Sequence, residues 1–177
     1  MRILVCGASG FVGRHLFDGL QRAGHHCVRG ARKQRVSSDV VIDYLHDVET
    51  AAWLPKLQGI DVVINAVGIL RDSKAQPMQK VLAEAPAALF KACAAAGVSR
   101  IINVSALGVE GPLMTPYFQR RREAEAVLFA SAASIRWLNL RPSLIYGEDG
   151  ASAKMFRLLA ALPLHALPMG GKQLLQP

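Results

Sequence analysis

Short apolar runs alternate along the chain with longer segments whose apolar residues recur at helical spacing. The runs are expected to be buried strands of a parallel sheet, because such strands are covered on both faces. They lie at residues 2–6, 26–28, 40–42, 61–65, 100–105 and 137–140. Helices are predicted at residues 11–23, 51–57, 116–133 and 152–161, and in the stretch that ends at Gly97. This alternation predicts an α/β fold, a Rossmann-type doubly wound parallel sheet with helices on both faces.

The composition indicates one globular domain with a substantial core. Apolar residues make up 51% of the 177 positions and charged residues 19%, which excludes a disordered chain. We therefore expect residues 1–177 to form a single domain. The first strand leads directly into a glycine-rich turn, so no signal peptide is predicted. The most apolar later stretch, residues 155–169, is too short and too broken by proline and charge to span a bilayer.

The cysteines and histidines follow no disulfide or metal-binding pattern. Cys6, Cys27 and Cys93 are odd in number and widely spaced, and each lies in an apolar stretch. Such thiols are expected to be reduced and buried, which favours a cytoplasmic protein. The five histidines are scattered without ligand spacing, so no metal site is predicted.

The formal net charge of +8 comes mainly from arginine-rich clusters. One cluster lies at residues 29–35 and another at residues 120–122. A basic balance is compatible with nucleic acid, an anionic membrane or a phosphorylated ligand. Neither cluster is long or interleaved with aromatic residues, as a single-strand-binding groove would be. We therefore favour solvated or phosphate-binding arginines and keep a nucleic-acid-associated protein as the less favoured alternative.

A glycine-rich turn, Gly7-Ala8-Ser9-Gly10-Phe11-Val12-Gly13, joins the first predicted strand to the first predicted helix. Gly7 permits the tight turn, Gly10 lets the backbone approach a pyrophosphate, and Gly13 lets the helix pack against the strand. Backbone N–H groups at the helix start, together with the helix dipole, would then face the phosphates. The turn predicts a dinucleotide ligand, against the alternative of an ordinary strand–turn–helix built from small residues.

The residues after the second predicted strand bear on the choice between NAD and NADP. An acidic residue there would bind the ribose 2′-hydroxyl, whereas arginine accommodates a 2′-phosphate. The segment Arg29-Gly30-Ala31-Arg32-Lys33 contains no acid. We therefore expect NADP(H) rather than NAD(H), with Arg32 as the main phosphate partner and Arg29 as the second. The alternative is that these cations are simply exposed in a loop.

Four motifs occur in the order found in short-chain dehydrogenases. They are the glycine turn, Asn65-Ala66-Val67-Gly68, Val104-Ser105-Ala106-Leu107-Gly108 and Leu140-Arg141-Pro142-Ser143-Leu144-Ile145-Tyr146-Gly147. The chain resembles the atypical or extended short-chain dehydrogenase/reductase family over essentially its whole length. It is most similar to the NAD-dependent epimerase/dehydratase-like and NmrA-like branches. Residues 62–70 are similar to the short-chain-dehydrogenase-like accessory subunit of respiratory complex I.

The resemblance implies a set of cofactor-binding positions. By position, the pyrophosphate would be wrapped by Gly7, Ser9, Gly10, Phe11, Val12 and Gly13. The adenine would lie near Asp43 and Tyr44, although Asp43 could equally be an acid of a surface turn. The riboses would be lined by Ala66, Val67 and Gly68, and the nicotinamide would be flanked by residues 142–145, with Pro142 and Ile145 at the ends.

The same resemblance implies a catalytic centre that is altered in this chain. The family uses a Tyr-x-x-x-Lys pair on the helix after the fifth strand and a Ser or Thr at the end of that strand. Here Tyr117 is present, but Arg121 replaces the lysine; it keeps the positive charge and holds its proton far more firmly. The family's hydroxyl falls where this chain has Ala106, one position after Ser105. Ser105 could therefore be catalytic or only a structural or ribose contact.

Family members continue beyond the sixth strand into a substrate-binding lobe. Residues 170–177 lie where that lobe would begin, so we expect most of it to be absent from this chain. The favoured hypothesis is an NADP(H)-dependent oxidoreductase or nucleotide-sugar epimerase-like enzyme that uses Tyr117, Arg121 and Ser105. The alternative is a catalytically silent dinucleotide-binding module, either a redox sensor or an accessory or assembly protein of a respiratory complex. The small-molecule substrate stays unknown, and an oligomer is compatible with the sequence.

Overall fold

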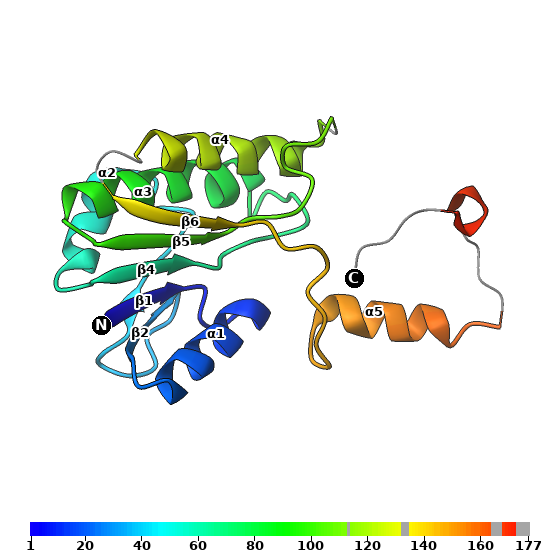
Figure 1. Cartoon of the computed structure of the whole chain (residues 1–177), viewed down its shortest axis with the longest axis horizontal. Helices are drawn as coiled ribbons and strands as arrows, with labels where there is room; N and C mark the ends of the chain where they lie inside the picture. Colours follow the sequence, from blue (N-terminus) through cyan, green and yellow to red (C-terminus); the bar gives the residue numbers. More distant parts are fainter. Residues whose placement is uncertain (113, 132–134, 164–167, 173–177) are drawn as a thin grey trace. The chain divides into compact units, whose positions relative to one another are not determined.

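The computed structural model describes residues 1–112, 114–131, 135–163 and 168–172, and the chain divides into two compact units, Met1–Arg141 and Pro142–Pro177. The first unit contains the sheet and the helices that cover it (Figure 1). The second unit contains helix α5 (Ala151–Ala160) and a short 3-10 helix, η3 (Pro168–Gly171).

The first unit is built on a six-stranded parallel sheet. Its strands are β1 (Arg2–Cys6), β2 (His26–Ala31), β3 (Val40–Val41), β4 (Val62–Asn65), β5 (Arg100–Val104) and β6 (Arg136–Leu140), and their spatial order is β3-β2-β1-β4-β5-β6. This order confirms the predicted Rossmann-type doubly wound sheet. The chain adds strands outward on one side from β1 to β3 and then on the other side from β4 to β6, so the strand order reverses between β1 and β4. Ligands of such sheets bind in the crevice that opens at this point, at the carboxyl ends of the strands.

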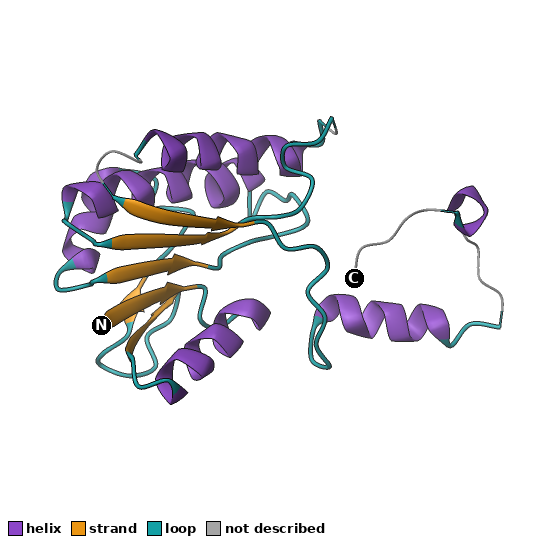
Figure 2. Cartoon of the chain, in the orientation of Figure 1, coloured by secondary structure: helices purple, strands orange, loops and turns teal. Residues whose placement is uncertain are grey.

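Helices cover both faces of the sheet (Figure 2). On one face lies α1 (Phe11–Arg22). On the other lie α2 (Thr50–Trp53), the π-helix η2 (Gln79–Glu84), α3 (Ala85–Ala95) and α4 (Pro116–Ala130), with the 3-10 helix η1 (Leu54–Leu57) following α2. Two apolar cores result because neighbouring strand residues face opposite ways: Ile3 and Val5 pack with Phe17 of α1, whereas Leu4 packs with Leu89 of α3.

Several element boundaries differ from the predicted ones for local reasons. The helix predicted at residues 51–57 becomes α2 followed by η1, because Pro55 has no N–H group to continue the α-helical bonding. The helix predicted before Gly97 begins as η2 and becomes α3, and Pro86 lies in the first turn of α3. Strand β2 continues three residues past the predicted end at Val28, because residues 29 and 30 pair with β1.

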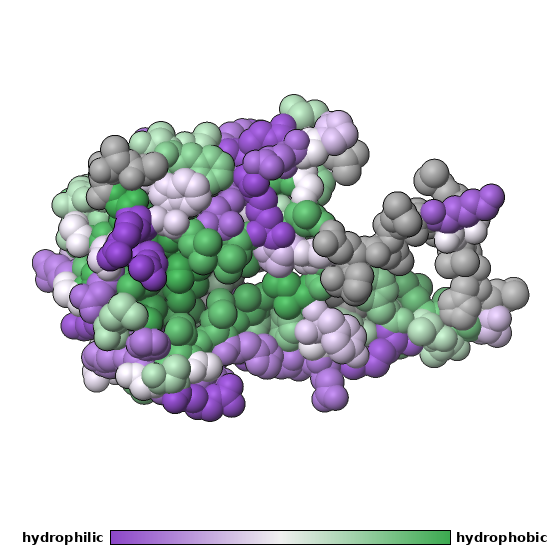
Figure 3. All heavy atoms as spheres, in the orientation of Figure 1, coloured by the Kyte–Doolittle hydropathy of each residue, from purple (hydrophilic) through white to green (hydrophobic). Residues whose placement is uncertain are grey.

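Strand β6 forms an open edge of the sheet. Its neighbour β5 pairs with it along one side, from Arg100↔Arg136 to Val104↔Leu140. Trp137, Leu138 and Leu140 of β6 are exposed. In the space-filling view, apolar side chains gather over the strands between β6 and α1 (Figure 3).

Candidate functional site

The glycine turn is held tightly between β1 and α1. Gly7 has a left-handed backbone with φ of 83°, and its N–H group donates to the Gly30 carbonyl at 3.1 Å. A Cβ on Gly13 would lie 2.6 Å from the carbonyl carbon of Gly7, so α1 packs against the turn only because Gly13 has no side chain. Gly10 caps α1 without a side-chain hydrogen bond, and the first turn carries no acid. The N–H groups of that turn are therefore suited to an anion.

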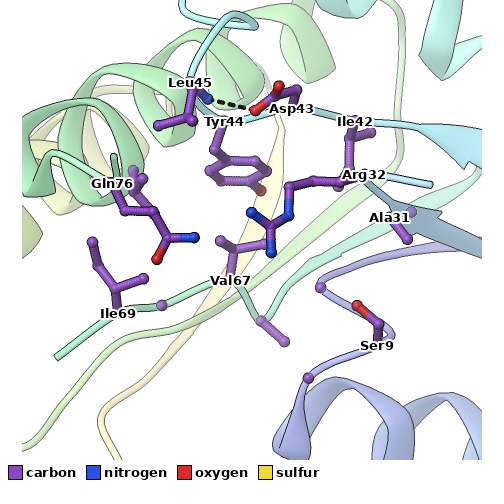
Figure 4. A pocket seen from close by; sticks show the side chains of 16 residues that line it. Ser9, Ala31, Arg32, Ile42, Asp43, Tyr44, Leu45, Val67, Ile69 and Gln76 are labelled. Atoms are coloured by element: carbon purple, nitrogen blue, oxygen red, sulfur yellow. Dashed lines mark hydrogen bonds between the residues drawn. The ribbon is translucent and has the colours of Figure 1, made fainter. Parts of the chain in front are cut away.

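A pocket of about 200 Å³ opens beside this turn at the carboxyl ends of β1, β2 and β4 (Figure 4). All of its walls belong to the first unit. The lining residues are Gly7, Ser9, Gly10, Gly30, Ala31, Arg32, Ile42, Asp43, Tyr44, Leu45, Ala66, Val67, Gly68, Ile69, Gln76 and Val81. Nine of the predicted cofactor residues thus line one pocket: Gly7, Ser9, Gly10, Arg32, Asp43, Tyr44, Ala66, Val67 and Gly68.

The other predicted cofactor residues lie elsewhere. Phe11 and Val12 are in the first turn of α1 and do not line the pocket, and the Phe11 ring contacts the ring of His15. Gly13 does not line the pocket, and its role is to let α1 pack closely against the glycine turn. Pro142 and Ile145 belong to the second unit, so their predicted contact with the nicotinamide stays a prediction.

The two arginines that were expected to bind a 2′-phosphate have different surroundings. The Arg32 side chain reaches into the pocket toward Tyr44 and Val67 (Figure 4). Arg29 is inside β2, and its guanidinium lies 4.3 Å from the centre of the Phe17 ring and donates to the Ala8 carbonyl at 3.2 Å. Arg29 therefore braces α1 and the turn, and Arg32 is the cation that faces the pocket.

Asp43 forms an acidic corner of the pocket. Its Oδ1 accepts the Leu45 N–H at 3.0 Å and its Oδ2 lies 2.8 Å from His46 Nδ1. Partial burial opposes ionisation, but these partners and the charge of Arg32 hold the pKa of Asp43 below its usual range. The pocket thus presents the Asp43 carboxylate and the Arg32 guanidinium to a ligand.

Tyr117 and Arg121 meet on α4, as their four-residue spacing predicts. Arg121 Nε donates to the Tyr117 hydroxyl at 3.1 Å, and Arg121 Nη1 donates to the Val104 carbonyl at 2.8 Å. A Cβ on Gly68 would lie 2.5 Å from Arg121 Nη2, so the guanidinium also lies against the loop after β4. The arginine therefore joins the helix, the end of β5 and that loop.

Ser105 follows β5 and does not line the open pocket. It is 5% exposed, and its hydroxyl is buried near the Glu125 carboxylate. It borders a cavity of about 10 Å³ together with Arg121 and Asn103, among others. The structure thus brings Ser105 and Arg121 together, whereas Tyr117 does not line this cavity.

A set of polar residues on β4, β5, β6 and α4 is absent from the predicted site. Asn65, Asn103 and Asn139 lie side by side at matched positions of β4, β5 and β6 and bond to one another through their side chains. Glu125 of α4 is 2% exposed and binds Arg141 at 2.6 Å. The available signal was an asparagine near the end of each of three consecutive predicted strands.

Glu125 makes the stability of the fold depend on pH. Burial opposes its ionisation, but the Arg141 guanidinium, helped by the nearby Ser105 and Asn139 side chains, holds the pKa of Glu125 below its usual range. A depressed pKa stabilises the folded state above the unfolded value of about 4.3 and loses that contribution as the pH falls through the folded value.

We expect Glu125→Gln to lower the unfolding free energy at neutral pH by about 1.5–3 kcal/mol, because the buried carboxylate loses its charge-assisted hydrogen bonds to Arg141. The variant should also lose less stability than the parent between neutral pH and the acid range. Urea unfolding at both pH values measures this difference. Glu110→Gln is the control, since Glu110 binds the same Arg141 at 2.6 Å from a 75% exposed position. Equal pH dependence in the parent and both variants would show that Glu125 does not titrate as described.

Comparison with known proteins identifies the family of the chain. A family profile described as NAD(P)H-binding matches residues 7–160, which is most of the chain. The chain belongs to this NAD(P)H-binding family. It is 29% identical over 168 residues to a ceramide reductase of Caulobacter vibrioides, covering 92% of this chain and 52% of that protein. The chain thus spans about half the length of that reductase.

Solved structures show the same fold. A putative NAD-dependent epimerase/dehydratase from Bacillus halodurans is 27% identical, with a TM-score of 0.70 over 85% of this chain and 74% of that one. A nucleoside-diphosphate sugar epimerase from Corynebacterium glutamicum is 21% identical, with a TM-score of 0.75 over 91% of this chain and 38% of that one. The resemblance to epimerase/dehydratase-like short-chain dehydrogenases is therefore confirmed for this NAD(P)H-binding protein.

Two further properties concern the described residues alone. None of their helices is long and apolar enough to cross a membrane. No group of three or more histidine, cysteine or acidic side chains among them could hold a metal ion.

Proposed function

We propose that the protein binds NADP(H) and uses it in a short-chain-dehydrogenase type of reaction at a hydroxyl or carbonyl carbon. The observation that carries the proposal is the pocket that combines the glycine turn with Arg32 at the reversal point of the sheet. The residues present fit a dinucleotide, because the turn leaves no room for a Cβ at Gly13 and the start of α1 offers uncapped N–H groups.

The preference for NADP(H) follows from the charge at the end of β2. Arg32 reaches into the pocket where an acid would bind the ribose 2′-hydroxyl in NAD-dependent relatives. Residues 29–36 contain no acid that would repel a 2′-phosphate. Arg29 is held over Phe17 and is not needed for this role.

We expect Arg32→Ala to weaken NADPH binding about tenfold to a hundredfold and to leave NADH binding unchanged. One hydrogen bond to a charged group contributes about 1.5–3 kcal/mol, and 1.4 kcal/mol corresponds to a tenfold change in affinity. Titration of the protein with each dinucleotide, followed by calorimetry or by the fluorescence of the reduced nicotinamide, gives both constants.

Lys33→Ala is the matched control, because Lys33 is an exposed neighbouring cation that does not line the pocket. It should change neither affinity beyond a small, salt-sensitive effect. Tighter binding of NADH than NADPH by the parent protein would overturn the assignment of Arg32, while leaving dinucleotide binding itself intact.

The chemistry we propose depends on the Tyr117–Arg121 pair. The bound dinucleotide would give or take the hydride, and Tyr117 would give or take the proton on the substrate oxygen. Arg121 donates to the Tyr117 oxygen through Nε, so the tyrosine keeps its own O–H for a substrate. The similarity to the Caulobacter reductase makes ceramide the first compound to assay, and nucleotide sugars are the second class.

A second candidate function is supported by Ser105 and Arg121. The Ser105 hydroxyl is enclosed behind the site, and Arg121 Nη1 is bound to the Val104 carbonyl. These features are compatible with a catalytically silent module that binds NADPH as a sensor or as an accessory subunit. Such a module would show a rise in melting temperature with NADPH, because a ligand of the folded state stabilises it, but no turnover of either substrate class.

A further inference from the structure

A row of side-chain amides, two of them buried and one half-buried, crosses the sheet near the ends of β4, β5 and β6. Tyr44 donates its hydroxyl to Asn65 Oδ1 at 2.9 Å, and Asn65 Nδ2 donates to Asn103 Oδ1 at 2.9 Å. Asn103 Nδ2 then donates to Asn139 Oδ1 at 2.8 Å, and Asn139 lies close enough to Glu125 to lower its pKa. Every donor therefore points the same way, toward the Glu125 carboxylate. We call Asn65, Asn103 and Asn139 the asparagine row.

The two ends of the asparagine row are fixed by different means. Burial raises the pKa of Tyr44 well above its usual range, so its hydroxyl keeps the proton that it donates. At the other end, Glu125 is a buried carboxylate bound by Arg141. Hydrogen bonds of one polarity strengthen one another in a low-dielectric interior, so a change at one end should be felt at the other.

The asparagine row connects the pocket to the helix that carries the catalytic pair. Asn65 Oδ1 also accepts the N–H of Val67 at 3.3 Å, and Val67 lines the pocket. Glu125 follows Tyr117 and Arg121 at four-residue steps, so the three share one side of α4.

We propose that Glu125 is a positioning residue: through the asparagine row and Arg141 it fixes α4 so that Arg121 stays between the Val104 carbonyl and the Tyr117 hydroxyl. This inference rests on the proposed function of the Tyr117–Arg121 pair. A positioning role explains why Glu125 is paired with Arg141 at this place. Apolar side chains of the same volume would fill the space without the free-energy cost of removing a charge from water.

The test follows the tyrosines by fluorine NMR in protein labelled with 3-fluorotyrosine. The chain has three tyrosines, Tyr44, Tyr117 and Tyr146, whose signals are assigned from the three Tyr→Phe variants. We expect Glu125→Gln to move the signals of Tyr117 and Tyr44 by more than a line width. Glu110→Gln, which removes the exposed partner of the same Arg141, should move neither.

Breaking the asparagine row tests whether the effect of Glu125→Gln reaches Tyr44 through the row or is only a local change in α4. In an Asn103→Leu background, Glu125→Gln should still move Tyr117 but no longer Tyr44. Asn139→Ala, at a half-buried position of the edge strand, serves the same purpose if the first variant does not fold. A Glu125→Gln effect confined to Tyr117, or an equal effect of Glu110→Gln, would overturn the proposal.

The NMR experiment needs no cofactor or substrate, so its outcome is independent of whether the protein binds NADPH. Titration of the same samples with NADPH tests the proposed function separately. We expect Glu125→Gln to weaken NADPH binding by up to about tenfold, the effect of one neutral hydrogen bond, because the loop at Val67 is held less firmly. Unchanged NADPH affinity together with moved Tyr44 and Tyr117 signals would restrict the positioning role to the catalytic pair.

Discussion

Replacing Gly13 with alanine is expected to destabilise the fold by about 3 kcal/mol or more, at or above the upper end of ordinary overpacking, and to abolish NADPH binding. The new Cβ would lie 2.6 Å from the carbonyl carbon of Gly7 and 3.0 Å from the Ala8 nitrogen. Both are backbone atoms of the glycine turn and cannot move aside as the end of a flexible side chain could. Helix α1 would have to move away from β1, and the N–H groups of its first turn would no longer face the phosphates of NADPH. Denaturant unfolding and NADPH titration measure the two effects.

Gly19→Ala is the matched control for this prediction. Gly19 lies in the same helix, but a Cβ there would meet nothing within 4 Å. Alanine at this position should stabilise the protein by up to about 1 kcal/mol, because it restores helix propensity without a clash. If the two alanine variants unfold and bind NADPH alike, α1 does not pack against the turn as described.

The parts of the site that depend on local sterics could be predicted from the sequence. A tight turn, a close helix–strand contact and a strand-to-helix transition each need glycine at a particular place, and Gly7, Gly10 and Gly13 stand at those places. The four-residue spacing of Tyr117 and Arg121 was likewise enough to place the two side chains together on α4.

The two arginines after the second strand show where a local pattern is insufficient. Arg29 and Arg32 have similar neighbours in the sequence, and both were expected near the 2′-phosphate. Pairing with β1 and β3 extends β2 to Ala31, so Arg29 stays inside the strand and only Arg32 lies past its end. The length of a strand is decided by its neighbours in the sheet, which no short window of sequence contains.

The asparagine row was missed for a related reason. An asparagine near the end of a strand is ordinarily a turn residue, and each of the three is unremarkable alone. Their significance depends on the register that aligns Asn65 with Asn103 and Asn103 with Asn139, across 38 and 36 residues of chain. The pairing of Glu125 with Arg141 is of the same long-range kind.

Tyr117→Phe is expected to lower turnover about a hundredfold to ten-thousandfold, the range that general acid–base catalysis contributes. The phenyl ring preserves the packing of α4 but removes the hydroxyl that would exchange a proton with the substrate oxygen. NADPH affinity should stay unchanged, because Tyr117 does not line the pocket. The measurement is the rate of NADP+ reduction with ceramide and of NADPH oxidation with a panel of carbonyl compounds, each at a saturating concentration of the dinucleotide.

Tyr146→Phe is the matched control, because Tyr146 is a 68% exposed tyrosine that loses the same hydroxyl. A Tyr117→Phe variant that turns over as fast as Tyr146→Phe would remove Tyr117 from the reaction. If the parent protein binds NADPH and turns over none of these compounds in either direction, the silent module becomes the favoured function. Arg121 would then act as a brace between α4 and the Val104 carbonyl, and the pocket would hold NADPH as a structural or sensed ligand.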